Sequence, residues 1–298
     1  MKEGRVMRNP MLDPATVRSA LRTLGVRPTR AMGQNFLIDA GALATIVTAG
    51  AVDANTTVVE VGPGLGVLTW ELIARAQHVI SIELDARLAE RLRTVFADVP
   101  HLTVVHQDIL QTDVAQVTAQ MPYRVVANLP YAITSPVLRH FLEATHPPVQ
   151  MVVLVQREVA QRICAQPGDM SVLAHAIQIR AVPELVAIVP PQAFLPAPEV
   201  HSAVLKLTMR AVPLVPLIDE PWVMRIIKAG FLHARKQLGN SLAHGLMAHG
   251  IPLQRSDVQD LLTALTIDPM RRAETLTIAE WQRIAGALSA YRPAPAES

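Results

Sequence analysis

The segment EVGPGLG, residues 60–66, places three glycines at alternate positions directly after the β-branched run TTVV. Gly62, Gly64 and Gly66 permit a tight turn and a close approach of a ligand to the backbone, because glycine lacks a Cβ and tolerates positive φ. The spacing is G-x-G-x-G, whereas the dinucleotide fingerprint is G-x-G-x-x-G. The loop therefore indicates a ligand site in which phosphate binding is the weaker interpretation. An ordinary strand-to-helix turn is the alternative.

Two carboxylates lie at the ends of the next two strand-like runs. Glu83 stands 21 residues after Gly62 in HVISIEL, and Asp108 closes LTVVHQDIL. A carboxylate at the first position suits the two donating hydroxyls of a ribose, and one at the second can accept from an adenine amine. Because the carboxyl ends of parallel strands share one edge of a sheet, the loop and both acids predict a nucleoside-binding edge. Each acid alone could be an ordinary loop residue.

The motif NLPY follows a further strand-like run and suits a planar exocyclic amine. The side-chain oxygen of Asn128 and the carbonyls of Leu129 and Pro130 can accept hydrogen bonds from such an amine, while Tyr131 stacks on the ring. Phe194, in the proline-containing segment FLPAPEVHSAV, can form the second face of a base sandwich. We therefore predict these five residues to be catalytic, with a structural loop and a core phenylalanine as the alternatives.

Strands that alternate with helices must position these side chains. Such alternation predicts βαβ units and a parallel sheet with helices on both faces, which is an α/β fold. The expected strands are 56–59, 78–84, 102–110, 123–131 and 151–156, with helices at 39–51, 85–99, 112–121 and 135–145. From residue 182 the pattern changes to proline-punctuated β segments that end in VHSAVLKLTMR.

A proline-rich linker at 211–222 separates this pattern from a helical one. Helices are expected at 222–247, 256–266 and 277–291. The sequence therefore predicts a catalytic domain with a basic N-terminal arm over 1–210 and a helical RNA-recognition domain over 211–298. On the helix that begins at Trp222, one face of about 160° holds the basic residues Arg225, Lys228, His233, Arg235 and Lys236. This stripe favours contacts with RNA phosphates, and a solvated polar face is the alternative.

Composition limits the remaining classes of function. The chain has 298 residues, 50% of them hydrophobic, and a net charge of +2, but residues 1–36 hold seven Arg and Lys against two acidic residues. This asymmetry is typical of a polyanion partner, although a solvated terminus would show it too. Cys164 is the single cysteine, which excludes an internal disulfide framework and a cysteine-cluster metal site. With no apolar run of about 18 residues and no signal pattern, we expect a cytoplasmic protein without metal or membrane association.

The ordered set GQNFL, EVGPGLG, IEL, QDIL, NLPY, FLPAPEVHSAV and DPMRRAETLTIAEW resembles the KsgA-type ribosomal RNA adenine dimethyltransferases from about Arg30 to Leu288. The resemblance implies a Rossmann-like, S-adenosylmethionine-dependent methyltransferase domain with a small all-helical C-terminal domain. It also implies dimethylation of two adjacent adenines in a hairpin near the 3′ end of small-subunit (16S) rRNA, coupled to small-subunit biogenesis. The expected partner is this rRNA or the assembling 30S particle, and the expected state is a monomer.

The resemblance also assigns roles to residues. It implies that Asn35 and Leu37 close over the cofactor and that Asn128 lies between the cofactor and the target, with no general base. The full expected cofactor set is Gln34, Asn35, Leu37, Gly62, Gly64, Glu83, Asp108 and Asn128. Arg30 is the expected RNA-binding residue before GQNFL. Ala31 and Met32 stand where the family usually has basic residues, so fewer cations are expected to contact the RNA there. The segment near Gly168 is also shorter than in the family.

Three other functions share parts of this sequence pattern. A resistance methyltransferase that acts on an adenine of large-subunit rRNA shares several of these motifs, but DPMRRAETLTIAEW and FLHARKQLGNSL favour the small subunit. A ribosome-assembly factor with dispensable catalysis is the alternative from another class, and intact Asn128, Tyr131 and Glu83 argue against it. A nicotinamide dehydrogenase is disfavoured by the missing G-x-G-x-x-G and by NLPY.

Overall fold

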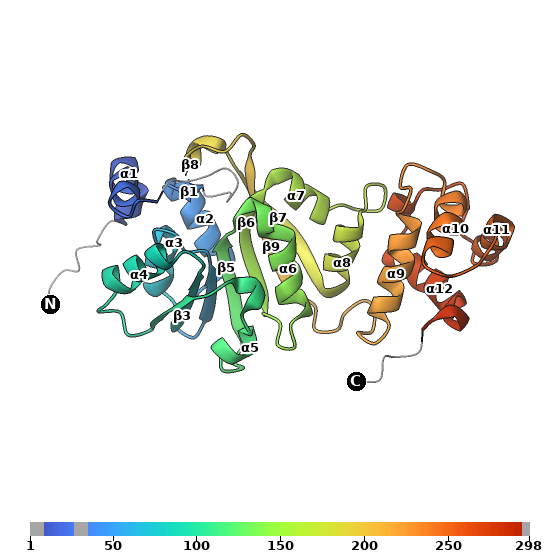
Figure 1. Cartoon of the computed structure of the whole chain (residues 1–298), viewed down its shortest axis with the longest axis horizontal. Helices are drawn as coiled ribbons and strands as arrows, with labels where there is room; N and C mark the ends of the chain where they lie inside the picture. Colours follow the sequence, from blue (N-terminus) through green and yellow to red (C-terminus); the bar gives the residue numbers. More distant parts are fainter. Residues whose placement is uncertain (1–8, 27–34, 294–298) are drawn as a thin grey trace. The chain divides into compact units, whose positions relative to one another are not determined.

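The computed structural model describes residues 9–26 and 35–293, and it divides the chain into two compact units (Figure 1). Unit 1 comprises residues 1–160 and 183–209, and unit 2 comprises 161–182 and 210–298. The predicted boundary after residue 210 lies next to the last of these divisions. Residues 161–182, which the prediction placed inside the first domain, group instead with the C-terminal helices.

A mixed sheet forms the centre of unit 1. Among the described residues its strands follow the order β4-β3-β2-β5-β6-β9-β7. The five strands from β4 to β6 are parallel, and β9 is antiparallel to β6. The strands are β2 (Thr57–Val61), β3 (His78–Glu83), β4 (Leu102–His106), β5 (Tyr123–Asn128), β6 (Gln150–Gln156), β7 (Ala181–Val189) and β9 (Ser202–Met209).

Helices cover this sheet because its central strands are apolar on both faces. Every residue of β2 is buried, as is every residue of β6 except the last. Helix α2 packs on β5, β6 and β9, while α4 packs on β3 and β4. The helices of this part of the chain are α1 (Pro14–Thr23), α2 (Ala40–Gly50), α3 (Val67–Ile73), α4 (Ala86–Val95), α5 (Val114–Val117), α6 (Thr134–Glu143) and α7 (Arg157–Ile163).

The strand order sets the place where a ligand can bind. From β2 the chain moves outward to β3 and β4, and then returns to add β5 and β6 on the other side of β2. Ligands of open α/β sheets bind at the carboxyl ends of the strands where the order reverses in this way. Here that point lies between the ends of β2 and β5, which carry the glycine loop and NLPY.

A two-stranded antiparallel sheet adds the N-terminal segment to unit 1. Strand β1 (Phe36–Leu37) pairs with β8 (Phe194–Leu195), and Leu37 stands opposite Phe194. Both of these side chains belong to one hydrophobic cluster that also takes in buried residues of α1 and α2. The motifs GQNFL and FLPAPEV are therefore packed together.

Unit 2 is helical and has its own hydrophobic core around the fully buried Trp281. Its helices are α8 (Val172–Arg180), α9 (Glu220–Gly230), α10 (Leu238–Ala248), α11 (Arg255–Ala264) and α12 (Ile278–Ala287). At one edge, Arg180 and Glu220 form an ion pair at 2.9 Å that joins α8 to α9.

The single helix predicted over 222–247 is wrong, because α9 ends at Gly230 and α10 begins at Leu238. Ser241 holds the turn between them, since its hydroxyl donates to the Gly230 carbonyl at 2.6 Å and accepts from the His233 amide at 3.0 Å. The two helices then pack closely: a Cβ on Gly245 would lie 2.0 Å from the carbonyl oxygen of Ala229. A continuous helix could not make this crossing.

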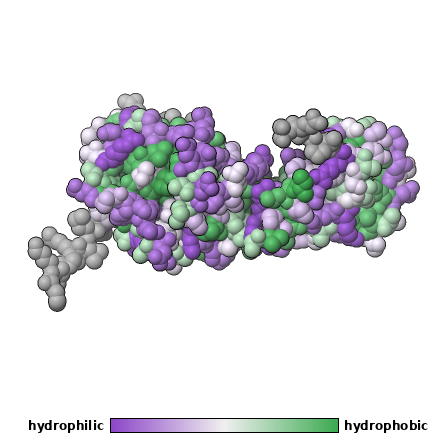
Figure 2. All heavy atoms as spheres, turned by 90° about the horizontal axis from the view of Figure 1, so that it is seen from below, coloured by the Kyte–Doolittle hydropathy of each residue, from purple (hydrophilic) through white to green (hydrophobic). Residues whose placement is uncertain are grey.

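The surface mixes polar and apolar side chains, with green apolar patches between purple hydrophilic ones (Figure 2). Several apolar side chains of the predicted linker are exposed, namely Val212, Leu214, Leu217 and Ile218. In the described ranges, no helix has both the length and the hydropathy needed for a membrane span.

Candidate active site

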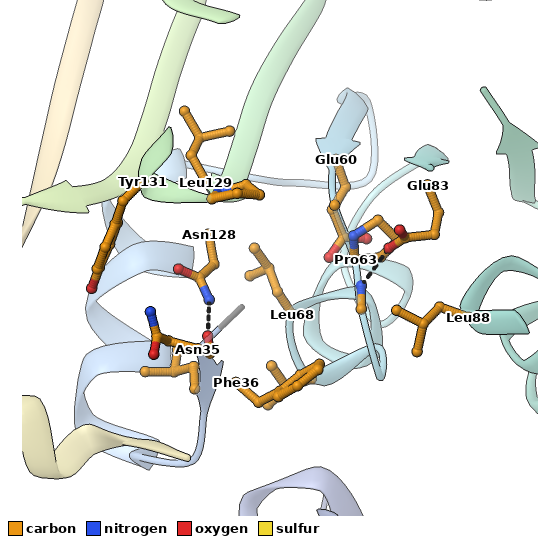
Figure 3. Close-up of a pocket in the computed structure, with 15 residues that line it drawn as sticks. Asn35, Phe36, Glu60, Pro63, Leu68, Glu83, Leu88, Asn128, Leu129 and Tyr131 are labelled. Atoms are coloured by element: carbon orange, nitrogen blue, oxygen red, sulfur yellow. Dashed lines mark hydrogen bonds between the residues drawn. The ribbon is translucent and has the colours of Figure 1, made fainter. Parts of the chain in front are cut away.

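A cleft in unit 1 opens where the sheet reverses its strand order (Figure 3). Its empty space of about 660 Å³ includes open solvent, so the cleft is a solvent-open groove. The residues that line it are Asn35, Phe36, Leu37, Glu60, Gly62, Pro63, Gly64, Val67, Leu68, Glu83, Leu88, Asn128, Leu129, Pro130 and Tyr131.

The glycine loop forms one wall of the cleft. Gly62, Gly64 and Gly66 have φ of +62°, +60° and +86°, a region that side chains with a Cβ rarely adopt. The Gly64 amide donates to Glu83 Oε2 at 3.0 Å, and the Gly62 amide donates to the Ile82 carbonyl at 2.9 Å. A Cβ on Gly64 would lie 3.1 Å from the Phe36 ring. The loop therefore keeps its backbone open to a ligand.

Glu83 lies at the end of β3, as predicted, and lines the cleft. Its two oxygens accept from the amides of Gly64 and Asp85, each at 3.0 Å. Burial raises the pKa of its carboxyl group above the ordinary value, and the two amide bonds oppose this rise. The carboxylate is held rigidly with lone pairs to spare, which suits donation from the hydroxyls of a ribose.

Glu60, in β2, is a cleft residue that the sequence reasoning missed. It is 1% exposed, and its Oε2 accepts from the hydroxyls of Thr69 and Ser81 at 2.7 Å each. Its Oε1 has no hydrogen-bond partner in the described part of the chain. Burial is the main cause that raises the pKa of Glu60 to about 7. An acid inside the apolar run TTVVEV was the signal that could have revealed it, because buried acids require a partner.

The unpartnered oxygen of Glu60 tests whether a cofactor such as S-adenosylmethionine fits the cleft. A buried acceptor without a donor is costly and calls for a ligand group that donates or carries positive charge. The amino acid portion of that cofactor carries an ammonium group, and its ribose supplies hydroxyls to an acid such as Glu83. The donor and acceptor groups of the cleft therefore fit the cofactor.

Asn128 ends β5 on the side of the cleft opposite Glu83 (Figure 3). Its side-chain nitrogen donates to the main-chain carbonyl of Asn35 at 3.0 Å. This bond fixes the orientation of the amide, so its oxygen is the end that can accept from an exocyclic amine. Asn35 and Asn128 thus line one site together.

Tyr131 lines the cleft beside Asn128, at the start of a single 3₁₀ turn. Its hydroxyl shares a 2.6 Å hydrogen bond with that of Ser202, a fully buried residue at the start of β9. Burial raises the pKa of Tyr131, so the hydroxyl stays protonated. Its ring is thereby held by the segment that follows FLPAPEV.

Other predicted site residues lie elsewhere. Asp108 caps the 3₁₀ turn Ile109–Gln111 by accepting from the Leu110 amide at 2.9 Å, and it does not line the cleft. Phe194 is 3% exposed and belongs to the hydrophobic core of unit 1. The contacts predicted for these two residues with an adenine and a target base stay predictions. Gln34 and Arg30 lie outside the described residues.

The predicted cationic stripe is not one helix face. Arg225 and Lys228 lie on α9, whereas Arg235 and Lys236 lie in the turn that follows it. Arg225 is half-buried and donates to the His249 carbonyl, while Lys228, Arg235 and Lys236 are exposed. Three cations remain available to a polyanion. Within 9–26 and 35–293, no group of three His, Cys, Asp or Glu residues is placed to hold a metal ion.

The chain is similar to known proteins over most of its length. The sequence model of the family described as "Ribosomal RNA adenine dimethylase" matches residues 27–284. The "Ribosomal RNA small subunit methyltransferase A" of Dehalococcoides mccartyi is 44% identical over 87% of this chain and 88% of its own. The protein of the same name from Enterococcus faecalis is 39% identical over 94% and 97%.

Two solved structures share the fold. The 23S rRNA methyltransferase ErmE superposes with a TM-score of 0.68 at 28% identity, covering 86% of this chain and all of its own. A dimethyladenosine transferase from Plasmodium falciparum has a TM-score of 0.69 at 23% identity, covering 83% and 95%. Both confirm the predicted Rossmann-like α/β architecture.

Proposed function

The chain belongs to the ribosomal RNA adenine dimethylase family, and on this basis we propose that it dimethylates two adjacent adenines in a hairpin near the 3′ end of 16S rRNA. It is an S-adenosylmethionine-dependent rRNA adenine methyltransferase that acts on the small subunit. The observation that carries the finer proposal is the arrangement of Asn128, whose amide is oriented by the Asn35 carbonyl beside the glycine loop.

The cleft residues divide into those that hold the cofactor and those that face the target. Gly62 and Gly64 would lie against the amino acid portion of S-adenosylmethionine, with Glu60 as an acceptor for its ammonium, and Glu83 would accept from the ribose. When bound, the cofactor supplies an electrophilic methyl group on a sulfonium. The chain's task is then to align a weak nucleophile with that methyl group and to exclude water.

The target side of the cleft activates an adenine amine. The Asn128 oxygen and the Leu129 carbonyl accept from the N6 hydrogens, which turns the nitrogen lone pair out of the ring plane. The Pro130 carbonyl, also predicted as an acceptor, is already occupied by the Ile133 amide at 3.1 Å and the Thr134 hydroxyl at 3.4 Å. Tyr131 stacks on the flipped base, and extrusion of that base costs a few kcal/mol, less from a hairpin loop. The methylated nitrogen is acidic and loses its proton to water or a carbonyl, so no general base is needed.

In this proposal, unit 2 provides positively charged side chains that bind the RNA. Lys228, Arg235 and Lys236 are its exposed cations near the end of α9, and they suit phosphates of a folded RNA. The protein would act as a monomer on the assembling 30S particle in the cytoplasm. The basic N-terminal arm, with Arg30, would add to the same contact.

The decisive experiment offers labelled S-adenosylmethionine with small and large subunits that lack the modification. We expect dimethyladenosine at adjacent positions of 16S rRNA, mapped by mass spectrometry, and loss of the label with Asn128→Ala. The structural likeness to ErmE supports the large-subunit enzyme as the second candidate. Label in the large subunit alone would establish that candidate, and RNA binding without label would favour an assembly factor.

A second experiment tests the RNA contact. Arg235→Ala with Lys236→Ala removes two exposed cations, so the slope of log K against log salt should fall by up to about 2, with cofactor affinity unchanged. Arg255→Ala, an exposed cation on α11, is the matched control. An unchanged slope in the double variant would remove this turn from the RNA interface.

A further inference from the structure

The segment Asn9–Val26 is fastened to the glycine loop by side chains that the proposed reaction does not use. Asn9 Nδ2 donates to the Val67 carbonyl, at the first residue of α3, at 2.8 Å. Arg91, on α4, donates through Nη1 to the Leu65 carbonyl at 2.7 Å. Leu65 stands between Gly64 and Gly66, so both bonds reach main-chain oxygens in or next to the cofactor loop.

Arg91 also touches the N-terminal segment itself. Its Nη2 lies 3.4 Å from the Met11 sulfur, and Met11 is buried in the same hydrophobic cluster as Leu65 and Val67. Burial lowers the pKa of Arg91, and no ion pair is seen for it among the described residues. A partly desolvated guanidinium that binds a neutral loop carbonyl makes a strong, charge-assisted hydrogen bond. Such a bond fixes geometry.

Both polar atoms of the Asn9 side chain are hydrogen-bonded, which fixes the orientation of its amide. It is 5% exposed, and its Oδ1 accepts from the Met11 amide at 3.1 Å while its Nδ2 donates to Val67. At the far end of the segment, Arg87 donates to the Gly25 carbonyl at 2.9 Å. The segment is therefore attached at both ends, and only its first end reaches the loop.

A loop with three glycines needs such external support. Glycine loses more backbone freedom on ordering than any other residue, so a loop of this kind is the easiest part of the cleft to disorder. Its amides are tied to Glu83, Ile82 and Pro63, which lie in unit 1 at the loop and β3. The carbonyl of Leu65 is tied to Arg91, and through Arg91 to the N-terminal segment.

We propose that Asn9 and Arg91 are positioning residues that couple the segment Asn9–Val26 to the glycine loop and set the loop conformation that binds S-adenosylmethionine. This inference rests on the proposed function, because it assumes that the loop holds this cofactor. If either bond is lost, the loop should also adopt conformations that cannot bind the cofactor. The apparent affinity then falls in proportion to the fraction of molecules whose loop is still competent to bind. Methyl transfer at saturating cofactor should be little changed.

The test measures the Kd of S-adenosylmethionine and S-adenosylhomocysteine by calorimetry for the full chain. Arg91→Ala should raise both values about tenfold, since the loop loses a charge-assisted hydrogen bond and only the competent fraction of the loop binds. Asn9→Asp keeps the size of the side chain and the acceptor for the Met11 amide, but it puts a carboxylate oxygen opposite the Val67 carbonyl in place of the donor, so it should raise Kd severalfold. The kcat at saturating cofactor should stay near the wild-type value, while KM for the cofactor rises.

Arg93→Ala is the matched control, because Arg93 is on the same helix and donates to a main-chain carbonyl, that of Val104, away from the loop. It should leave both Kd values unchanged. If Arg91→Ala does not fold, Arg91→Lys and Asn9→Asp carry the test. Wild-type Kd values in the folded variants, with lower Tm alone, would overturn the proposal. If the wild-type protein binds no cofactor at all, it is the proposed function that fails.

Discussion

Replacement of Glu60 by glutamine should remove a pH-dependent loss of stability from unit 1. The carboxyl group is buried in β2 and lacks a partner for Oε1, and its pKa is raised from 4.5 to about 7. The folded state therefore holds this proton more tightly than the unfolded chain does. The stabilisation is present below pH 4.5 and is lost as the pH rises through about 7.

The magnitude follows from the shift. The rise of the Glu60 pKa from 4.5 to about 7 corresponds to about 3 kcal/mol of unfolding free energy at 1.36 kcal/mol per pKa unit. About 2.5 kcal/mol of this stabilisation is lost between pH 5 and pH 8. Glu60→Gln keeps the shape but does not titrate. The unfolding free energy of the variant, minus that of the wild type, should thus rise by about 2.5 kcal/mol over this range.

Urea unfolding without cofactor, followed by circular dichroism at several pH values, measures this difference. The pKa of Glu83 is also raised by burial, and both proteins contain Glu83, so only the smaller effect of its charge on Glu60 differs between them. Glu90→Gln, at an exposed position of α4, is the control and should show no such trend. A difference between Glu60→Gln and the wild type that is independent of pH would refute the reasoning.

Two further predictions concern single contacts. Tyr131→Phe and Ser202→Ala each remove the same hydrogen bond of about 1 kcal/mol, so each variant should lower kcat/KM about fivefold. Because the two variants lose one shared bond, the double variant should be no worse than either single variant. Additive losses in single-turnover methyl transfer would contradict this. Gly245→Ala forces a Cβ to within 2.0 Å of the Ala229 carbonyl oxygen and should lower the unfolding free energy by about 2 kcal/mol in thermal melts. Gly286→Ala, where a Cβ meets nothing within 4 Å, should be neutral or stabilising, and an equal loss in both would exclude the helix crossing as the cause.

Local pattern was enough to predict the sheet and the residues at the carboxyl ends of its strands that line the cleft. The buried runs that became β2 and β3, the glycine loop between them and Asn128 at the end of β5 all depend on short-range signals. Once parallel strands are inferred, the common edge of the sheet brings Glu83 and Asn128 to one cleft. The site could thus be assembled from the sequence without knowledge of distant contacts.

The features that sequence reasoning missed depend on pairings that are distant along the chain. The sequence left a stacking and a core position open for Phe194, because its burial accompanies the pairing of β8 with β1, a contact that no local pattern encodes. The break after Gly230 arises from the close packing of α9 and α10 and from the Ser241 hydroxyl, although the residues between are good helix formers. Glu60 was overlooked because its role depends on Thr69 and Ser81, which come from other elements.

The division of the chain into units has a consequence for anyone who wishes to exchange parts between relatives. The backbone crosses from one unit to the other three times, near residues 160, 182 and 209. A protein truncated after residue 210 would keep α8 but lose α9 to α12, exposing the apolar side chain of Ile179. A chimaera with a foreign C-terminal unit must therefore transplant two separate stretches together. Unit 2 is thus interleaved with unit 1 along the chain, and a fusion made at residue 210 alone would not transfer it whole.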